Sequence, residues 1–373
     1  MKKKTVAMLM TVAMAATLMT GCGSQAETTA STEETTTEDT AAETDTEASE
    51  ETTEENTDTA EAGAAYKVGI VQYVDDASLN QIEAAIEAEL DAKAAELGVT
   101  FDYADYTYNG QADATTLNQI ATELIASEVD VIVPIATPTA MIMQNATEDN
   151  QIPVVFSAVS DPVTAGLVDS LEAPGANITG TSDALNTEAV MDLMFAANPD
   201  ITKVGLLYNK SEDSSKAPIE AAIAYCEDKG VEVVEKTGTT NDEVSLAADA
   251  LIAAGVDAIF TPTDNTVMTA ELAIYEKFIE AGIPHYTGAD SFALNGAFLG
   301  FGVNYEELGT ATADIVADIL VNGADTASYS IVTLDNGIAT VNTETAEAIG
   351  LDYSMFADMC AEVKEITTAE EFE

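Results

Sequence analysis

From residue 66 onward, short apolar runs alternate with segments in which apolar residues recur every three or four positions. Residues 68–71 form one such run, and helical spacing follows at Leu79, Ile82, Ile86 and Leu90, with Gly98 expected to end the helix. Further runs that we interpret as strands cover 99–106, 129–136 and 152–157. The repetition predicts an α/β fold with a parallel sheet that helices cover on both faces.

The same alternation starts again near residue 179 and predicts a second sheet. Its expected strands, separated by amphipathic segments, are 203–207, 231–235, 257–261 and 283–286. Two Rossmann-like lobes with parallel sheets and a cleft between them account for both series. We expect lobe 1 to comprise 66–178 plus about 300–325, and lobe 2 to comprise 179–299 plus about 326–373.

The N-terminal segments follow a different pattern. Residues 1–22 begin with lysines, continue with an apolar run and end in LMTGC, which is typical of a secretory signal and too short for a spanning helix. The ending resembles a bacterial lipobox, which implies a lipid anchor on Cys22, with plain secretion as the alternative. Residues 23–65 are rich in Thr, Glu and Ala and predict a disordered acidic tether.

The charge of the chain narrows its possible ligands. The 373 residues include 67 acidic and 12 basic side chains, all of the latter lysine, for a net charge of −55. Nucleic-acid binding needs basic surface, so the composition argues against a nucleic-acid partner. Without arginine there is no bidentate clamp, and an anionic ligand group would be held by backbone amides, hydroxyls or a lysine.

The sequence contains no motif that indicates catalysis or metal binding. The single histidine, His285, is interpreted as structural, and Cys22, Cys226 and Cys360 lack metal-site spacing. Dinucleotide, Walker A, HExxH and nucleophile-elbow motifs are absent from the sequence. We therefore expect no cofactor, no metal and no enzyme activity.

Polar residues follow two expected strands of lobe 1, at the sheet edge where open α/β folds bind ligands. Thr137-Pro138 is typical of a helix start, with Thr137 as the cap, and free amides there favour a carboxylate. At the next strand end we expect Ser157 to face the ligand, whereas Ser160 and Asp161 could equally stabilise the turn. The candidates from these two strand ends are Thr137, Pro138, Thr139, Ser157, Ala158, Val159 and Asp161.

Lobe 2 offers acidic residues at the corresponding strand ends. One of these carboxylates could pair with a ligand ammonium; we favour Asp264 or Asp290 over Glu212 and leave the first two unranked. Helix capping is the alternative for Asp264 and its neighbour. The ring of Tyr73 could contact an apolar or aromatic ligand group, with core packing as the alternative. The candidates of this group are Tyr73, Asn209, Glu212, Asp264, Asn265 and Asp290.

Seven motifs occur in order: VGIVQYV (68–74), IATPTA (135–140), IPVVFSAVSDPV (152–163), NITGTSD (177–183), KVGLLYNKSEDSS (203–215), DAIFTPTDNTV (257–267) and FGVNYEELG (301–309). They resemble those of bacterial ABC-transporter substrate-binding lipoproteins of the tryptophan/tyrosine-binding type, with Asp75-Asp76 where members often carry His-Pro. The resemblance covers nearly all of 66–352. It implies a type I periplasmic-binding-protein fold, a hinged cleft that closes on tryptophan, tyrosine or phenylalanine, and delivery to a separate permease and ATPase.

We therefore expect a monomeric binding protein on the outer face of the cytoplasmic membrane, anchored through Cys22, with a small zwitterion as its ligand. The first alternative keeps the fold but takes a branched-chain amino acid, a sugar or a purine-like molecule; the Trp and Arg that sugar sites use are absent. A surface-anchored enzyme would need a nucleophile–base pair that the sequence does not supply. A transcription regulator would need a DNA-binding unit and a less negative charge.

Overall fold

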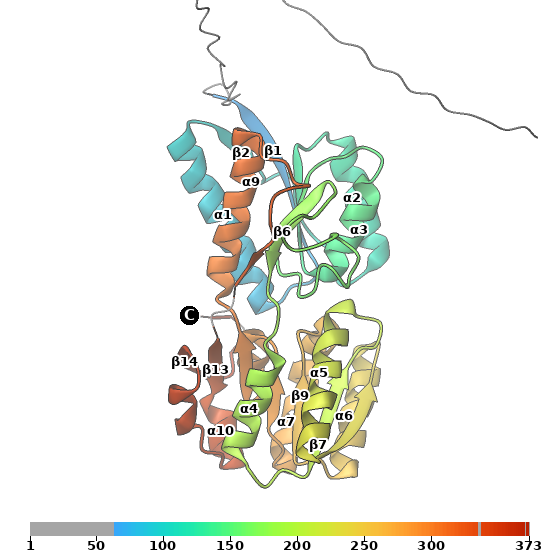
Figure 1. Cartoon of the computed structure of the whole chain (residues 1–373), viewed down its shortest axis with the longest axis vertical. Helices are drawn as coiled ribbons and strands as arrows, with labels where there is room; N and C mark the ends of the chain where they lie inside the picture. Colours follow the sequence, from blue (N-terminus) through green and yellow to red (C-terminus); the bar gives the residue numbers. More distant parts are fainter. Residues whose placement is uncertain (1–62, 335–336, 370, 373) are drawn as a thin grey trace, which may run out of the picture. The chain divides into compact units, whose positions relative to one another are not determined.

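The computed structural model describes residues 63–334, 337–369 and 371–372 (Figure 1). The predicted signal segment with Cys22, and the predicted tether up to residue 62, lie outside the described residues. The described part contains two seven-stranded sheets flanked by helices, which confirms the predicted α/β class with two parallel-sheet lobes. Within it, no helix is both long and apolar enough to cross a membrane.

Lobe 1 contains a sheet in which every strand pairing is parallel. Its elements are β1 (Ala65–Gln72), α1 (Ala77–Leu97), β2 (Thr100–Asp102), β3 (Thr107–Asn109), α2 (Ala114–Ala126), β4 (Val131–Ile135), α3 (Thr137–Thr147), β5 (Val154–Phe156), β6 (Ile178–Ser182), α9 (Tyr305–Asn322) and β12 (Val332–Thr333). The strand order is β12-β6-β5-β4-β1-β2, and β3 also pairs with β1.

Lobe 2 contains a sheet of order β14-β13-β11-β10-β9-β7-β8, in which only the pairing of β11 with β13 is antiparallel. Its strands are β7 (Lys203–Tyr208), β8 (Glu232–Thr237), β9 (Ala258–Thr261), β10 (His285–Thr287), β11 (Leu299–Gly302), β13 (Ile338–Asn342) and β14 (Glu362–Ile366). Its helices are α4 (Thr187–Ala197), α5 (Asp213–Lys229), α6 (Asn241–Ala254), α7 (Asn265–Ala281), α8 (Asp290–Leu294), α10 (Thr343–Ile349) and the 3-10 helix Ser354–Asp358.

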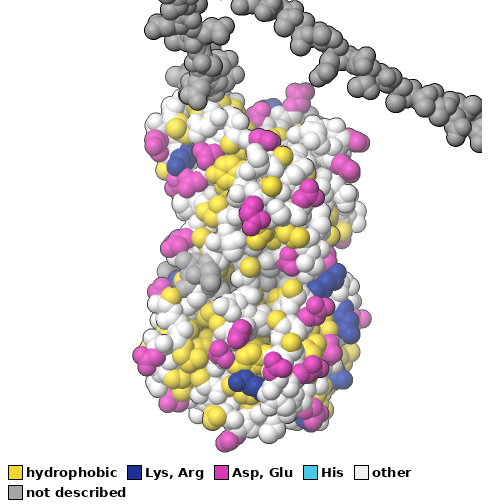
Figure 2. Space-filling view, viewed as in Figure 1, with side chains coloured by type: hydrophobic (Ala, Val, Ile, Leu, Met, Phe, Trp, Pro, Cys, Tyr) yellow, Lys and Arg dark blue, Asp and Glu magenta, His cyan; other side chains and the backbone are white. Residues whose placement is uncertain are grey.

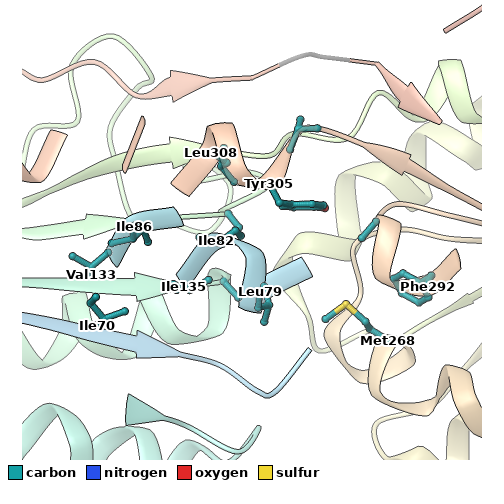
Figure 3. Close-up of a cluster of buried hydrophobic side chains, with 14 of the residues drawn as sticks. Ile70, Leu79, Ile82, Ile86, Val133, Ile135, Met268, Phe292, Tyr305 and Leu308 are labelled. Carbon is teal, nitrogen blue, oxygen red and sulfur yellow. The ribbon is translucent and has the colours of Figure 1, made fainter. Parts of the chain in front are cut away.

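Helix α9 follows most of lobe 2 in the sequence but packs against α1 of lobe 1 (Figure 1). The two helices approach closely at Gly309, where an added Cβ would lie 2.5 Å from the carbonyl oxygen of Ile82. Leu308 of α9 joins Ile82, Ile86 and Val133 in one buried cluster (Figure 3). Burying each such side chain contributes about 1.5–3 kcal/mol, so α9 completes the core of lobe 1.

The structure corrects several predicted boundaries. Strand β6 continues to Ser182 within lobe 1, and β11 belongs to lobe 2, so the chain returns to lobe 1 only at α9. Strand β12 pairs with β6 in lobe 1 rather than lying in lobe 2. The predicted strand 99–106 is shortened to β2, and a separate strand, β3, begins directly after it. Strands of two or three residues carry no periodic signal, so these pairings depend on tertiary contacts.

The lobes touch each other in the described structure. Residues 183–186 and 303–304 connect them, and the chain passes between them again from β12 to β13. Leu79 of α1, Met268 of α7 and Tyr305 of α9 belong to one buried cluster that reaches from lobe 1 into lobe 2 (Figure 3). The lobes are therefore closed on each other.

Candidate functional site

Three cavities of the described structure lie between the lobes. Two of them lie where carboxyl ends of strands from both sheets meet, and a third, of about 410 Å³, shares Ser160 and Ser214 with the inner one. An outer cavity of about 470 Å³ is lined by Tyr73, Pro138 and Met141 of lobe 1 and by the loops after β7, β8 and β9 of lobe 2. An inner cavity of about 30 Å³ touches it, since Thr137 and Asn265 line both. Pockets for small molecules measure roughly 300–1,000 Å³, so the outer cavity has a suitable size for one.

A further groove of the described part is a weaker candidate for a ligand site. A groove of about 700 Å³ runs along α1 and α9, where its lining includes Ala84, Ala88 and Glu306. No strand end of either sheet reaches it. The described residues also contain no group of three or more His, Cys, Asp or Glu side chains that could hold a metal ion.

Two strand ends of lobe 1 reach the inner cavity in strained backbone conformations. Ala136 has φ 80° and Ala158 has φ 54°, and both line the cavity. Such a conformation costs a residue other than glycine about 1–3 kcal/mol and concentrates at ligand sites. Ala136, rather than the predicted Thr137, is the N-cap of α3, and no side chain in the described structure caps this helix. Its first amides are therefore available to an anion.

Ser157, which was predicted to face the ligand, lines neither the inner nor the outer cavity. The Ser157 side chain is fully buried, with Oγ 3.2 Å from Thr181 Oγ1 and 2.9 Å from Thr312 Oγ1 of α9. The positive φ of Ala158 interrupts the alternation of the strand, and Ser160 lines the inner cavity instead. Ser157 therefore helps to fasten α9 to the sheet.

Asp183, directly after β6, provides the one carboxylate that lines the inner cavity. Ser160 Oγ donates to Asp183 Oδ1 at 3.0 Å. Since a hydroxyl has a single proton, Thr263 of lobe 2 donates in turn to Ser160, across 3.0 Å. No lysine or histidine of the described chain forms an ion pair with Asp183. Burial raises the pKa of Asp183 from 3.8 to about 6, so an incoming cation would stabilise its charged form.

Asp264 is fully buried and lines neither cavity, which corrects its predicted role. Its Oδ1 accepts from the amide of Val267 at 3.0 Å and so caps α7. Its Oδ2 accepts from the amide of Asn209 at 2.6 Å and from Ser215 Oγ at 2.7 Å. Burial and the nearby Glu212 raise the pKa of Asp264 to about 7. The carboxylate therefore joins the loops of lobe 2 rather than facing a ligand.

The other two acids that were predicted to contact the ligand, Glu212 and Asp290, also accept hydrogen bonds from the protein itself. Glu212 accepts from the amide of Asn265 at 2.9 Å and from that of Thr266 at 2.8 Å, although it does line the outer cavity. Asp290 lines neither cavity and accepts hydrogen bonds from Ser78 and Gln81 of α1. Asp290 thus joins lobe 2 to lobe 1, which corrects its predicted pairing with an ammonium.

Tyr73 lies at the outer cavity, as do Pro138 and Met141. Burial, and then the nearby Glu212, raise the pKa of Tyr73 to about 12, so its hydroxyl stays protonated as a hydrogen-bond donor. Asn209 lies on the opposite wall. The outer cavity therefore combines apolar surface from lobe 1 with polar groups from lobe 2.

Three further predicted residues line neither the inner nor the outer cavity, and of these Asp161 lines the third one. Thr139 and Val159 are fully buried. Asp161 accepts a hydrogen bond from the amide of Thr164 at 2.9 Å and so stabilises its own turn. The predicted residues that line the inner or the outer cavity are Tyr73, Thr137, Pro138, Ala158, Asn209, Glu212 and Asn265.

Comparison with known proteins identifies the family of the chain. The sequence model of the family described as "ABC transporter substrate binding protein" matches residues 67–357. The chain belongs to this family. This match confirms the predicted family. A substrate-binding protein of an ABC transporter works on the extracytoplasmic side and passes a small molecule to the permease.

Individual relatives of this substrate-binding protein agree with the fold. The "Tyrosine-binding protein" of Clostridioides difficile (strain R20291) is 32% identical over 286 residues, 76% of this chain and 81% of the relative. The ABC domain in complex with L-Trp from Streptococcus pneumonia is 28% identical, with a TM-score of 0.74, over 80% of this chain and all of that one. The ligand-free, open structure of a substrate binding protein with adhesive properties from Clostridium difficile is 31% identical, with a TM-score of 0.62, over 82% of this chain and all of that one.

Sequence reasoning missed Asp183, the carboxylate that lines the inner cavity of this substrate-binding protein. Asp183 ends the motif NITGTSD, so it is a polar residue directly after a strand, the same signal that drew attention to Asp264 and Asp290. The sequence did not decide whether Ser160 contacts the ligand or stabilises the turn. In the structure, Ser160 lines the inner cavity.

Proposed function

We propose that this substrate-binding protein captures an aromatic amino acid, L-tyrosine, L-tryptophan or L-phenylalanine, between its lobes. The observation that carries the proposal is the combination of an uncapped α3 N-terminus with the buried carboxylate of Asp183 at one inner cavity. These two groups complement the two charges of a zwitterion. The aromatic class is supported by the relatives, one a tyrosine-binding protein and one in complex with L-Trp.

The ligand carboxylate would accept hydrogen bonds from amides at the start of α3, next to Ala136 and Thr137. A helix N-terminus stabilises an anion by about 0.3–1 kcal/mol when exposed and up to about 2 kcal/mol when partly buried. This mode of binding needs no arginine, in keeping with a chain that has none.

The ligand ammonium would pair with Asp183. The inner cavity, at about 30 Å³, has the volume of about one water molecule and so admits only a small polar group. A charge-assisted hydrogen bond to an otherwise unpaired buried carboxylate contributes about 1.5–3 kcal/mol. The bond would draw the β6 end of lobe 1 and Thr263 of lobe 2 into one network and so favour closure.

The ligand side chain would occupy the outer cavity. Tyr73 and Pro138 offer ring faces, and Met141 offers a polarisable sulfur, all on one wall. Polar groups such as Asn209 on the opposite wall could bind a phenol hydroxyl or an indole N–H. The cavity of about 470 Å³ is large enough for either side chain.

L-tryptophan gives a direct test, because the chain contains no tryptophan and the ligand would be the sole indole emitter. We expect a saturable shift of its emission and calorimetric heat with L-tyrosine, L-tryptophan or L-phenylalanine. Tryptamine, which lacks the carboxylate, and N-acetyl-L-tryptophan, which lacks the ammonium, should each bind at least about tenfold more weakly. Tighter binding of leucine or a sugar, or no heat with any aromatic amino acid, would contradict the proposal.

We further propose that Cys22 carries a lipid anchor, that residues 23–65 tether the lobes to the outer face of the cytoplasmic membrane, and that the protein is a monomer without catalytic turnover. In cells that express the full chain, the wild type should fractionate with membranes and Cys22→Ser should not. Recovery of both forms in the membrane fraction would count against the anchor.

A further inference from the structure

Two carboxylates from different lobes, the buried Asp76 and the partly buried Asp290, meet at Ser78. Asp76 caps α1 of lobe 1 and accepts from the amide of Ser78 at 2.9 Å. Asp290 of lobe 2 accepts from the hydroxyl of the same serine. That hydroxyl accepts in turn from the amide of Ser291 at 3.1 Å, and Gln81 adds a second bond to Asp290 at 3.2 Å. Closure thus brings two acidic groups together around one hydroxyl.

No positive group compensates the pair at ion-pair distance in the described structure. Beyond the pair itself, the ionisable groups that interact with it are Tyr305 at the start of α9, which is also close to Asp183, and Lys364 of β14. Of these only Lys364 is cationic, and it acts on Asp290 from a distance. Opening of the lobes would return both carboxylates to water and separate them.

We propose that closure of the lobes is coupled to the uptake of a proton by the Asp76–Asp290 carboxylate pair. The proposal extends the function proposed above, because it makes ligand capture sensitive to the pH outside the cell. The pair acts on the closed conformation rather than on the ligand, since neither carboxylate lines the inner or the outer cavity.

The direction of the effect follows from burial. In the closed form, burial and the neighbouring Asp290 raise the pKa of Asp76 from 3.8 to about 7, and burial also raises that of Asp290. Water around the open form would bring the pKa of Asp76 back towards its usual value. A group whose pKa is raised in the closed form favours closure at low pH, and that contribution is lost as the pH rises through about 7.

Calorimetric titration of the full chain with L-tryptophan tests the coupling. Between pH 6.5 and 8.5 the affinity should fall about fourfold, and near pH 7 closure should take up about half a proton, measured from the heats in buffers of different ionisation enthalpy. Asp183, whose pKa is about 6, is already about three-quarters ionised at pH 6.5, and its further ionisation at higher pH would strengthen rather than weaken binding of an ammonium.

Asp76→Asn is the informative variant, because asparagine keeps the N-cap and resembles the protonated acid. Its affinity should stay constant over the same range. Asp75→Asn is the matched control: Asp75 is the exposed neighbour, and its loss removes the same charge without touching the pair. This control should keep the fourfold fall. A constant wild-type affinity, or an equal fall in Asp76→Asn, would overturn the proposal.

Small-angle scattering without ligand separates this proposal from the proposed function. The wild type should be more compact at pH 6.5 than at pH 8.5, and Asp76→Asn should be equally compact at both. Equal radii for the wild type at both pH values would refute proton coupling. Absence of aromatic amino-acid binding at any pH would instead refute the proposed function.

Discussion

Replacing Asp183 by asparagine should change binding and stability in opposite directions. The substitution removes the single carboxylate of the inner cavity but keeps its size and its bond to Ser160. Loss of a charge-assisted hydrogen bond of about 1.5–3 kcal/mol should weaken binding of L-tryptophan by roughly 10- to 150-fold. The ligand-free protein should nevertheless become more stable.

The gain in stability comes from the raised pKa of Asp183, which moves from 3.8 to about 6 in the folded protein. A raised pKa means that the stability linked to the protonated form is complete below about 3.8 and is lost as the pH rises through about 6. At pH 8 the wild type therefore bears a penalty of up to about 3 kcal/mol that Asp183→Asn does not bear. At pH 4 the two proteins should be nearly equally stable.

Urea denaturation at pH 4 and pH 8, together with calorimetry, measures both effects. Asp161→Asn is a matched control, because Asp161 stabilises a turn and lines neither the inner nor the outer cavity. It should leave the affinity for L-tryptophan within a factor of about two. If Asp183→Asn lowered affinity and stability together at pH 8, Asp183 would be a structural acid and not a partner of the ligand.

Three other substitutions probe strain, close packing and a buried pair. Ala136→Gly should raise the free energy of unfolding in urea by about 1 kcal/mol, since φ 80° suits glycine; a decrease would argue against strain. Gly180→Ala should lower stability by at least about 3 kcal/mol, because its Cβ would lie 2.1 Å from the Phe156 carbonyl oxygen; an unchanged melting temperature would disagree. His285→Phe should cost about 3–5 kcal/mol by leaving Glu271 buried without the 3.0 Å bond to His285, and adding Glu271→Leu should restore most of it; no recovery would contradict this reasoning.

The parts of the fold that rest on local patterns were predictable. The helix expected from Leu79, Ile82, Ile86 and Leu90 is α1, and Gly98 ends it with φ 68°. Local spacing suffices here because the apolar face and the left-handed cap are both properties of one short segment. The two strand–helix series likewise predicted two sheets.

The orientation of single side chains at the site was not predictable. Whether Ser157 or Ser160 meets the cavity depends on the positive φ of Ala158, which neighbouring segments impose. The sequence indicated that Asp264 could bind a ligand. In the structure its Oδ2 accepts a hydrogen bond from the amide of Asn209, which lies more than fifty positions earlier in the chain. Tertiary hydrogen bonds of this kind leave no trace in the local pattern.

The late position of α9 in the chain has a consequence for how the protein folds. The apolar face of α1, with Ile82 and Ile86, is covered by a helix roughly 200 residues further on, so a nascent chain cannot bury it when lobe 1 emerges. Lobe 1 can be completed only after nearly the whole polypeptide is available. Such an order of folding delays compaction of lobe 1 during synthesis, in a protein whose family works on the extracytoplasmic side of the membrane.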